Sequence, residues 1–366
     1  MTAPSVSAFS AEYSAARDRF RQAASSLGWQ LEAHPIDAAG PRGEELTIDV
    51  ACSSTGDPGR VLVVSSGLHG VEGFFGSAVQ VALLEQWKAT PPPAIKCVFL
   101  HGLNPFGFSW LRRVDENNVD PNRNFLLVDE RFEGAPDRYA QLDPFLNPTR
   151  PSSLWEPFTL TALPLLVRYG IPALRQAIAE GQYSYPRGLF FGGAGPSQTQ
   201  RLLARHFPRW LDGAESVVHL DFHTGLGRRG ACKLLIDYAP GERHRAWLTD
   251  WFGVGSFQTP DSSGSAYSAR GGFGRWCVSR SFAPDYLFAY AEFGTYSPIQ
   301  MLAGLRDENQ THHWGEASAA STTRAKERLK ELFCPADSRW RSRVLEHSRK
   351  LVDAAVHGLQ ARRSTP

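Results

Sequence analysis

Apolar residues recur at helical spacing near the start of the chain. Tyr13, Ala16, Phe20 and Ala23 fall on one face of a helix, and charged residues lie between them. This periodicity predicts an amphipathic N-terminal helix over about residues 10–27. Near residue 45 the composition becomes typical of β-strands, and the run ELTIDVAC predicts the start of a sheet.

Two apolar runs enclose a longer periodic segment. RVLVVSS is rich in β-branched residues, which is typical of a strand buried on both faces. FFGSAVQVALLEQW then predicts a helix, and AIKCVFLHG predicts a second buried strand. Strand, helix and strand at this spacing indicate a parallel crossover. ESVVHLDFHTG and DYLFAYAEFGTY add later strands, so the pattern predicts an α/β protein.

The middle of the chain is less regular than either side of it. Residues 126–215 contain a Pro-rich loop, a predicted helix around LPLLVRYGIPALRQAIAEGQ and the glycine-rich GLFFGGAGPS, and we interpret this stretch as a loop-rich insertion. Residues 323–362 predict a charged helical tail. Because no change in composition separates two halves, we expect a single domain over residues 1–366.

Composition excludes several classes of partner. Lys and Arg number 39 against 37 Asp and Glu, so no broad basic surface for nucleic acid or anionic membrane is expected. No stretch approaches the roughly 20 apolar residues of a membrane span, and the N-terminus lacks the pattern of a signal peptide. The five cysteines are scattered and odd in number, which favours a reducing compartment. We therefore expect a cytoplasmic protein whose oligomeric state is open.

One histidine–glutamate pair stands out by its position. His69 and Glu72 follow a buried strand and lie among glycines, where α/β sheets place ligand sites. Their spacing lets both side chains point to one side of a first helical turn, as two ligands of one metal must. His313 and Glu316 share this spacing but lie in a polar stretch. The first pair is therefore the stronger metal candidate.

A catalytic zinc usually takes a third protein ligand and leaves one position open. Strand alternation in SVVHLDFHTG puts His219, Asp221 and His223 on one face, with His223 at the end of the strand. His223 is the better third ligand for that reason, and we interpret His219 as a buried, hydrogen-bonded histidine. Asp221 either orients a ligand imidazole or is a simple strand-edge aspartate.

A loop rich in arginine and asparagine follows the second buried strand. Residues 101–125 hold Arg112, Arg113, Arg123 and five asparagines. Guanidinium and amide groups can hold a carboxylate or stabilise an oxyanion, although a structural turn network would need the same residues.

Five motifs in order give the chain a specific resemblance. HGVE at 69–72, NPFG at 104–107, RVDENNVDPNRNF at 113–125, DFHTG and AEFGT together resemble the zinc carboxypeptidase superfamily. The wording SSGLHGVEGFFGSA is more similar to an uncharacterised bacterial branch known only as a domain of unknown function. The resemblance spans about residues 10–330. It implies a mixed, mostly parallel sheet between two layers of helices.

The resemblance also implies roles for individual residues. It implies one zinc ion per chain, bound by His69, Glu72 and His223, with Glu292 as the general base that deprotonates a zinc-activated water. Arg113 would polarise the scissile carbonyl, and Asn122 with Arg123 would hold a terminal carboxylate. Tyr267 is a weak match to the tyrosine that closes over substrate in the family. Pro121 and Gln198 depart from the family pattern, in which leucine and glutamate are usual.

Glu292 is also unusual by physical reasoning alone. It interrupts the apolar strand YLFAYAEFGT, and a buried carboxylate is costly unless it faces a metal, a partner or water. A role facing the site is preferred over pairing with an arginine.

The leading hypothesis is a zinc-dependent hydrolase that cleaves an amide or C-terminal peptide bond beside a free carboxylate. The runner-up is a zinc-dependent deacylase of N-acyl amino acids or cell-wall-type peptides, because the same groups serve any amide beside a carboxylate. A zinc-binding protein without activity is the third reading. Serine hydrolysis is disfavoured, since SSG at 65–67 does not replace a G-x-S-x-G elbow.

Overall fold

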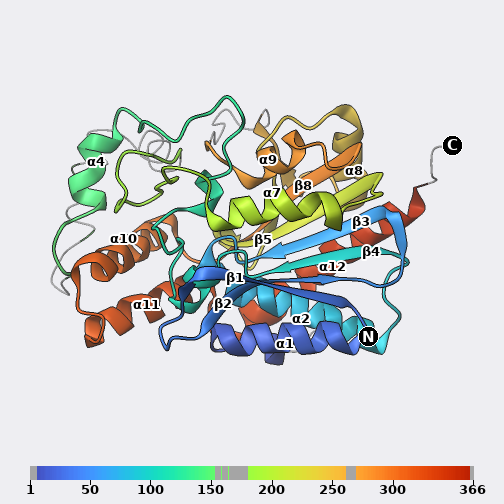
Figure 1. Ribbon diagram of the computed structural model, residues 1–366, viewed down its shortest axis with the longest axis horizontal. Coiled ribbons are helices and arrows are strands. Elements are labelled where there is room, and N and C mark those ends of the chain that lie inside the picture. The colour runs from blue at the N-terminus through green and yellow to red at the C-terminus, as the bar shows by residue number, and fades with distance from the viewer. Residues whose placement is uncertain (1–5, 153–157, 159–163, 165–179, 261–268, 363–366) are drawn as a thin grey trace.

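The computed structural model describes residues 6–152, 158, 164, 180–260 and 269–362 (Figure 1). Tyr267 and most of the helix predicted around residues 163–182 lie outside the described residues. Within the described part of the chain, no helix is both long and apolar enough to cross a membrane.

One eight-stranded sheet organises the described residues, in the order β1-β2-β4-β3-β5-β8-β6-β7. Its strands are β1 (Gln30–Ala39), β2 (Glu45–Cys52), β3 (Asp57–Ser66), β4 (Ile95–His101), β5 (Ser216–Arg229), β6 (Cys232–Leu235), β7 (Phe257–Gln258) and β8 (Asp285–Gly294). The central strands β4, β3, β5 and β8 run parallel, whereas β1, β2 and β6 pair antiparallel with a neighbour. The sheet is therefore mixed with a parallel centre.

Apolar residues on both faces explain why the central strands are buried. In β3, Leu62 and Val64 point into one core cluster, and Val61 and Val63 point into another. Each fully buried side chain of this size contributes about 1.5–3 kcal/mol. The continuous apolar run predicted from RVLVVSS is thus the signature of a strand covered on both sides.

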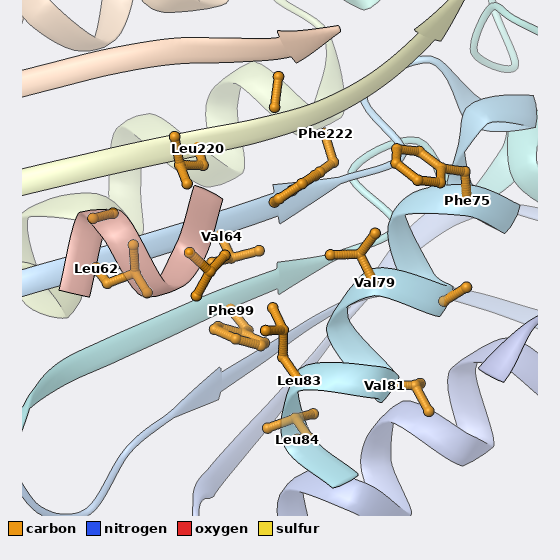
Figure 2. Close-up of a cluster of buried hydrophobic side chains, with 14 of the residues drawn as sticks. Leu62, Val64, Phe75, Val79, Val81, Leu83, Leu84, Phe99, Leu220 and Phe222 are labelled. Atoms are coloured by element: carbon orange, nitrogen blue, oxygen red, sulfur yellow. The ribbon is translucent and has the colours of Figure 1, made fainter. Parts of the chain in front are cut away.

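Three helices cover the first face of the sheet: α1 (Tyr13–Ser26), α2 (Gly73–Ala89) and α12 (Ser338–Ala361). Figure 2 shows Phe75, Val79 and Leu83 of α2 directed at the sheet, in which Leu220 and Phe222 lie on β5. Phe74 and Phe75 belong to this core, so the aromatic pair next to Glu72 mainly fills space between helix and sheet.

The second face carries α7 (Gln198–Trp210) and α9 (Phe273–Ser279) (Figure 1). Beyond one end of the sheet lie α4 (Tyr139–Leu146), α10 (Pro298–Trp314) and α11 (Ala320–Phe333), and the last two contact β5. Further helical segments among the described residues are η1 (Val6–Ala8), η2 (Gly70–Glu72), α3 (Pro105–Ser109), η3 (Pro121–Arg123) and α8 (Glu242–Phe252).

The predicted α/β class, with a mixed central sheet between helical layers, is confirmed by this arrangement. The predicted C-terminal tail is two helices, α11 and α12, separated by a short segment that contains Pro335. It is also no appendage, because Val344, Val352 and Leu359 of α12 are buried in the first core cluster. The segment 126–215 includes α7, which packs on the sheet through Leu203 and Phe207. The single-domain organisation stays a prediction.

Candidate metal centre and active site

His69 and Glu72 lie on the turn that joins β3 to α2. The strand ends at Ser66, and Gly67 then adopts φ +68°, a conformation that favours glycine. His69 precedes the short helix η2, and Glu72 ends it. Both side chains are buried. The glycines around the pair in the sequence therefore serve a tight turn at the carboxyl end of a parallel strand.

Two neighbouring strands bring the distant residues to the same place. In the parallel register of β5 and β8, His223 lies opposite Glu292, and Asp221 lies opposite Tyr290. Side chains two residues apart on a strand share a face, so all four face one side of the sheet. His223 is buried, while Glu292 is partly exposed.

The Glu72 carboxylate lies between the two imidazoles. His69 Nδ1 is 2.8 Å from Glu72 Oε1, and His223 Nδ1 is 3.1 Å from Glu72 Oε2. One ligand atom from each of the three residues lies within 4.8 Å of the others. Two neutral imidazoles and a carboxylate are a donor set that suits zinc, with a position left for water or substrate. The residues present therefore fit a zinc ion.

Each imidazole turns its second nitrogen to a buried aspartate. His69 Nε2 is 3.2 Å from Asp120 Oδ1, and His223 Nε2 is 2.6 Å from Asp221 Oδ2. Such carboxylates fix the tautomer that leaves Nδ1 free for a metal. Burial opposes ionisation of Asp221, but the adjacent His223 outweighs it and lowers the pKa of this aspartate. For Glu72, both imidazoles outweigh burial and hold its pKa below the ordinary value.

Arg113 reaches the same group of residues from the loop after β4. Its Nε donates to Asp120 Oδ2 at 2.9 Å, and its Nη2 lies 2.7 Å from His69 Nε2. Burial raises the pKa of Asp120. The positive charge of Arg113 outweighs this effect, together with His69, and holds the pKa of Asp120 well below its usual range. A metal on His69 Nδ1 requires a proton on Nε2, and Arg113 then no longer donates there.

Phe190 packs against Arg113 in a strained conformation. Its ring centroid lies 5.6 Å from the Arg113 guanidinium carbon, and its backbone has φ +59°. A bulky residue with positive φ is uncommon, and such strain is found mostly near functional sites. The glycine-rich loop GLFFGGAGPS was recognised in the sequence, but this contact depends on the tertiary fold.

Asn122 and Arg123 differ in what they present to the site. Asn122 is partly exposed, and its Oδ1 accepts hydrogen bonds from Phe273 N at 3.1 Å and from the Tyr290 hydroxyl at 3.0 Å. Its amide nitrogen is therefore the group oriented to donate. Arg123 is 1% exposed, and its Nη1 donates to the Asn122 carbonyl at 2.7 Å. Arg123 thus lies behind Asn122.

The surroundings of Glu292 shift the pKa of its carboxylate. Its Oε1 accepts a hydrogen bond from the Leu226 N–H at 2.8 Å. Burial, and then the negative charge of Glu72, raise the pKa of Glu292 to about 7. The carboxylate predicted to be the base therefore both gains and loses a proton near neutral pH.

His219 and Ser65 belong to a buried hydrogen-bond network that no pattern in the sequence predicts in full. Ser65 Oγ donates to Asp221 Oδ1 at 2.6 Å and lies 2.7 Å from His219 Nε2, while His219 Nδ1 lies 2.9 Å from the Tyr286 hydroxyl. His219 is thus the hydrogen-bonded core histidine that its position suggested. Ser65, His219 and Asp221 each have 0% exposure, so no substrate reaches this serine.

Asp120 contributes to the site, whereas His313 lies elsewhere. Asp120 was noticed only as part of the V-D-P-N-R motif, although it touches both His69 and Arg113. The competing His313 lies on α10, where its Nε2 is 3.2 Å from Asn118 Oδ1. Burial lowers the pKa of His313 to about 4, so it is neutral at pH 7.

A protein family described as "Protein of unknown function (DUF2817)" matches residues 9–347. The chain belongs to this family. The resemblance to an uncharacterised family of unknown function, inferred from SSGLHGVEGFFGSA, is thereby confirmed. No curated protein matches the sequence.

Several solved structures show a distant likeness. Carboxypeptidase A from Helicoverpa armigera has 11% identity and a TM-score of 0.45, with 87% of this chain and 73% of that chain covered. A putative metallopeptidase from Shewanella amazonensis has 17% identity and a TM-score of 0.40, covering 82% and 93%. A putative succinylglutamate desuccinylase/aspartoacylase from Shewanella frigidimarina has 15% identity and a TM-score of 0.37, covering 78% and 72%.

Proposed function

We propose that this protein is a zinc-dependent hydrolase that cleaves an amide bond beside a free carboxylate. The observation that carries the proposal is the buried group His69, Glu72 and His223 with Glu292 on the strand next to His223. The ordered motifs around these residues support the same reading. The substrate would be a small peptide or an N-acyl amino acid.

Zinc bound by His69, Glu72 and His223 would act as a Lewis acid toward the scissile carbonyl and a water molecule. Glu292 accepts a proton from the attacking water and returns it to the leaving amine. Because the pKa of Glu292 is about 7, a sizeable fraction of this carboxylate is ionised at neutral pH, and its conjugate acid still donates readily.

Arg113 supplies the positive charge for the oxygen that becomes negative. Its side chain is 15% exposed, and Asp120 holds it from behind through Nε. The Nη groups can then donate to the tetrahedral oxyanion, a contact that strengthens as the negative charge develops. This difference between ground state and transition state is what lowers the barrier.

The carboxylate of the substrate would be held by the Asn122 amide nitrogen. Phe273 and Tyr290 already occupy Asn122 Oδ1, so the amide cannot rotate without losing two hydrogen bonds. Arg123, buried behind Asn122, adds positive charge to this side of the site. A neutral or esterified substrate lacks the partner for these donors.

The decisive experiment measures zinc content and hydrolysis together. Purified wild-type protein is expected to hold one tightly bound zinc and to hydrolyse members of a library of peptides and N-acyl amino acids. Glu292→Gln should keep its zinc but lose at least about 100-fold in kcat. Glu215→Gln, an exposed glutamate, is the matched control and should behave as wild type.

Two results would contradict the proposal. One is wild-type protein that binds no zinc at its buried site, and the other is Glu292→Gln that hydrolyses substrate as fast as wild type. Each active substrate is also tested with its carboxylate blocked as an amide. Unchanged turnover of the blocked form would remove the assigned roles of Asn122 and Arg123. Preference for peptides or for N-acyl amino acids then separates peptidase from deacylase.

A further inference from the structure

A second cluster of metal-binding side chains lies away from the proposed active site. Glu32, His34 and His206 each offer one ligand atom within 4.8 Å of the others. Glu32 and His34 are two residues apart on β1, the edge strand of the sheet, and so share a face. His206 belongs to α7, which packs against that face. We propose that these three residues form a second, solvent-accessible site for a divalent transition metal such as zinc.

The positions of the two imidazoles support this proposal. The His34 and His206 rings are 4.6 Å apart between centroids, and His34 Nε2 is 3.1 Å from Glu32 Oε2. Trp210 stacks against His206 at 5.4 Å and donates its indole N–H to Glu32. The aromatic ring and hydrogen bond restrict the side chains before any ion binds, so less conformational freedom is lost on binding.

A cationic side chain already occupies the position expected for the metal. Arg209 Nη2 is 2.6 Å from Glu32 Oε2 and 3.3 Å from His206 Nδ1. The Arg209 guanidinium thus contacts an imidazole nitrogen and a carboxylate oxygen, and a metal ion at this site would contact the same two atoms. Arg209 is 60% exposed, so its guanidinium can move into water when an ion replaces it.

The charges around the cluster favour a neutral His206 and a modest affinity for the metal. Partial burial, followed by His34, Arg209 and Arg205, lowers the pKa of His206, and a metal needs the neutral imidazole. The carboxylate of Glu32 is the only negative charge among these groups, against the two arginines. Two imidazoles and one carboxylate leave room for water, which suits zinc better than calcium or magnesium.

An ion at this site would join the edge strand β1 to helix α7. Zinc should therefore raise the thermal stability of the protein through the second site as well as the first. This effect is independent of the proposed hydrolase activity, because the cluster lies on different elements from His69, Glu72 and His223.

Titration of zinc-depleted protein with Zn²⁺, followed by calorimetry, tests the proposal. Wild type should bind a second equivalent of Zn²⁺ more weakly than the first. This weaker equivalent should still bind to Glu72→Gln, in which the buried site is damaged. Glu32→Gln should weaken this equivalent at least about tenfold, whereas Arg209→Gln should tighten it about two- to fivefold because a competing ion pair is gone. The control is Glu12→Gln, which breaks an exposed ion pair between Glu12 and Arg42 that has no histidine beside it.

The outcomes separate this proposal from the proposed function. Loss of the weaker equivalent in Glu32→Gln, with the zinc-dependent rise in melting temperature reduced, supports the second site even if the buried site proves empty. If Glu32→Gln leaves the weaker equivalent unchanged, or if only His206→Ala removes it, the zinc binds a lone surface imidazole and the proposal fails. If Arg209→Gln binds zinc no more tightly than wild type, the Arg209 guanidinium does not compete with the metal for the site.

Discussion

At His69 and His223, the ring nitrogen that turns away from Glu72 meets a buried aspartate. Neither aspartate is isolated, since Arg113 holds Asp120 and Ser65 donates to Asp221. A charged group without partners would be costly at this depth, whereas a fully bonded one restricts the imidazole to a single orientation. The orientation of both imidazoles therefore depends on buried aspartates that are themselves held by hydrogen bonds.

Asp221→Asn tests this dependence directly. Asparagine still offers an oxygen to His223 but lacks the negative charge that favours a protonated Nε2 and an unprotonated Nδ1. Zinc affinity should fall about 10- to 100-fold, measured by competition with a chelator of known affinity. Asp237→Asn, which changes a partly buried carboxylate bonded to Tyr290, is the control. Equal affinities for wild type and Asp221→Asn would show that the charge of Asp221 does not support metal binding by His223.

At the scale of elements, η2 and the loop after α3 are held together by their backbones. Gly70 N donates to the Arg113 carbonyl at 3.1 Å, and Val71 N donates to the Arg112 carbonyl at 2.8 Å. These bonds couple the turn that carries His69 and Glu72 to the loop that carries Arg113. The approach is close because Gly70 has no side chain, and a Cβ there would overlap the backbone of Gly107.

Gly70→Ala should therefore damage two parts of the site at once. The added methyl group meets backbone rather than a flexible side chain, so we expect a loss of about 1–3 kcal/mol in the free energy of unfolding. Zinc affinity should fall as well, because η2 must move. Gly195→Ala is the control, since a Cβ at Gly195 has no neighbour within 4 Å. Denaturant unfolding and zinc competition on both variants check this, and similar results for the two variants would refute it.

At the scale of the whole molecule, two carboxyl groups with raised pKa values make stability depend on pH. Burial, and then Glu116, raise the pKa of Asp115 to about 7, and Glu292 is shifted in the same direction. An unfolded chain releases these protons near pH 4, whereas the folded chain keeps them until about pH 7. The folded state binds more protons in between, so its stability falls as pH rises through this window.

Asp115→Asn should remove part of that pH dependence. The amide oxygen can still accept the hydrogen bonds from Asn117 N and Val119 N. The variant should therefore gain stability relative to wild type as pH rises from about 4.5 to 8. Denaturant unfolding with metal chelated measures the difference, and Asp212→Asn, at an exposed position, is the control. A difference that is constant with pH, or that shrinks as pH rises, would contradict the prediction.

The α/β class and the residues grouped in the site were accessible from the sequence for local reasons. Buried parallel strands need apolar side chains on both faces, and the chain shows this as continuous apolar runs. Polar groups at the ends of such strands appear as short motifs in the sequence. The motif resemblance adds Arg113 and Glu292 to His69, Glu72 and His223. The five residues lie close together in the structure, while their roles stay a prediction.

Other features depend on which segments meet in three dimensions. Ser65 and Tyr286 join the network behind His223 because β3 and β8 flank β5, and their apolar neighbours conceal this role in the sequence. The burial of Arg123 behind Asn122 follows from the packing of η3 near α9. The group Glu32, His34 and His206 joins an edge strand to a helix about 170 residues away. Periodicity and motifs encode the elements and the local ligands, whereas side-chain environments come from long-range contacts that no local pattern records.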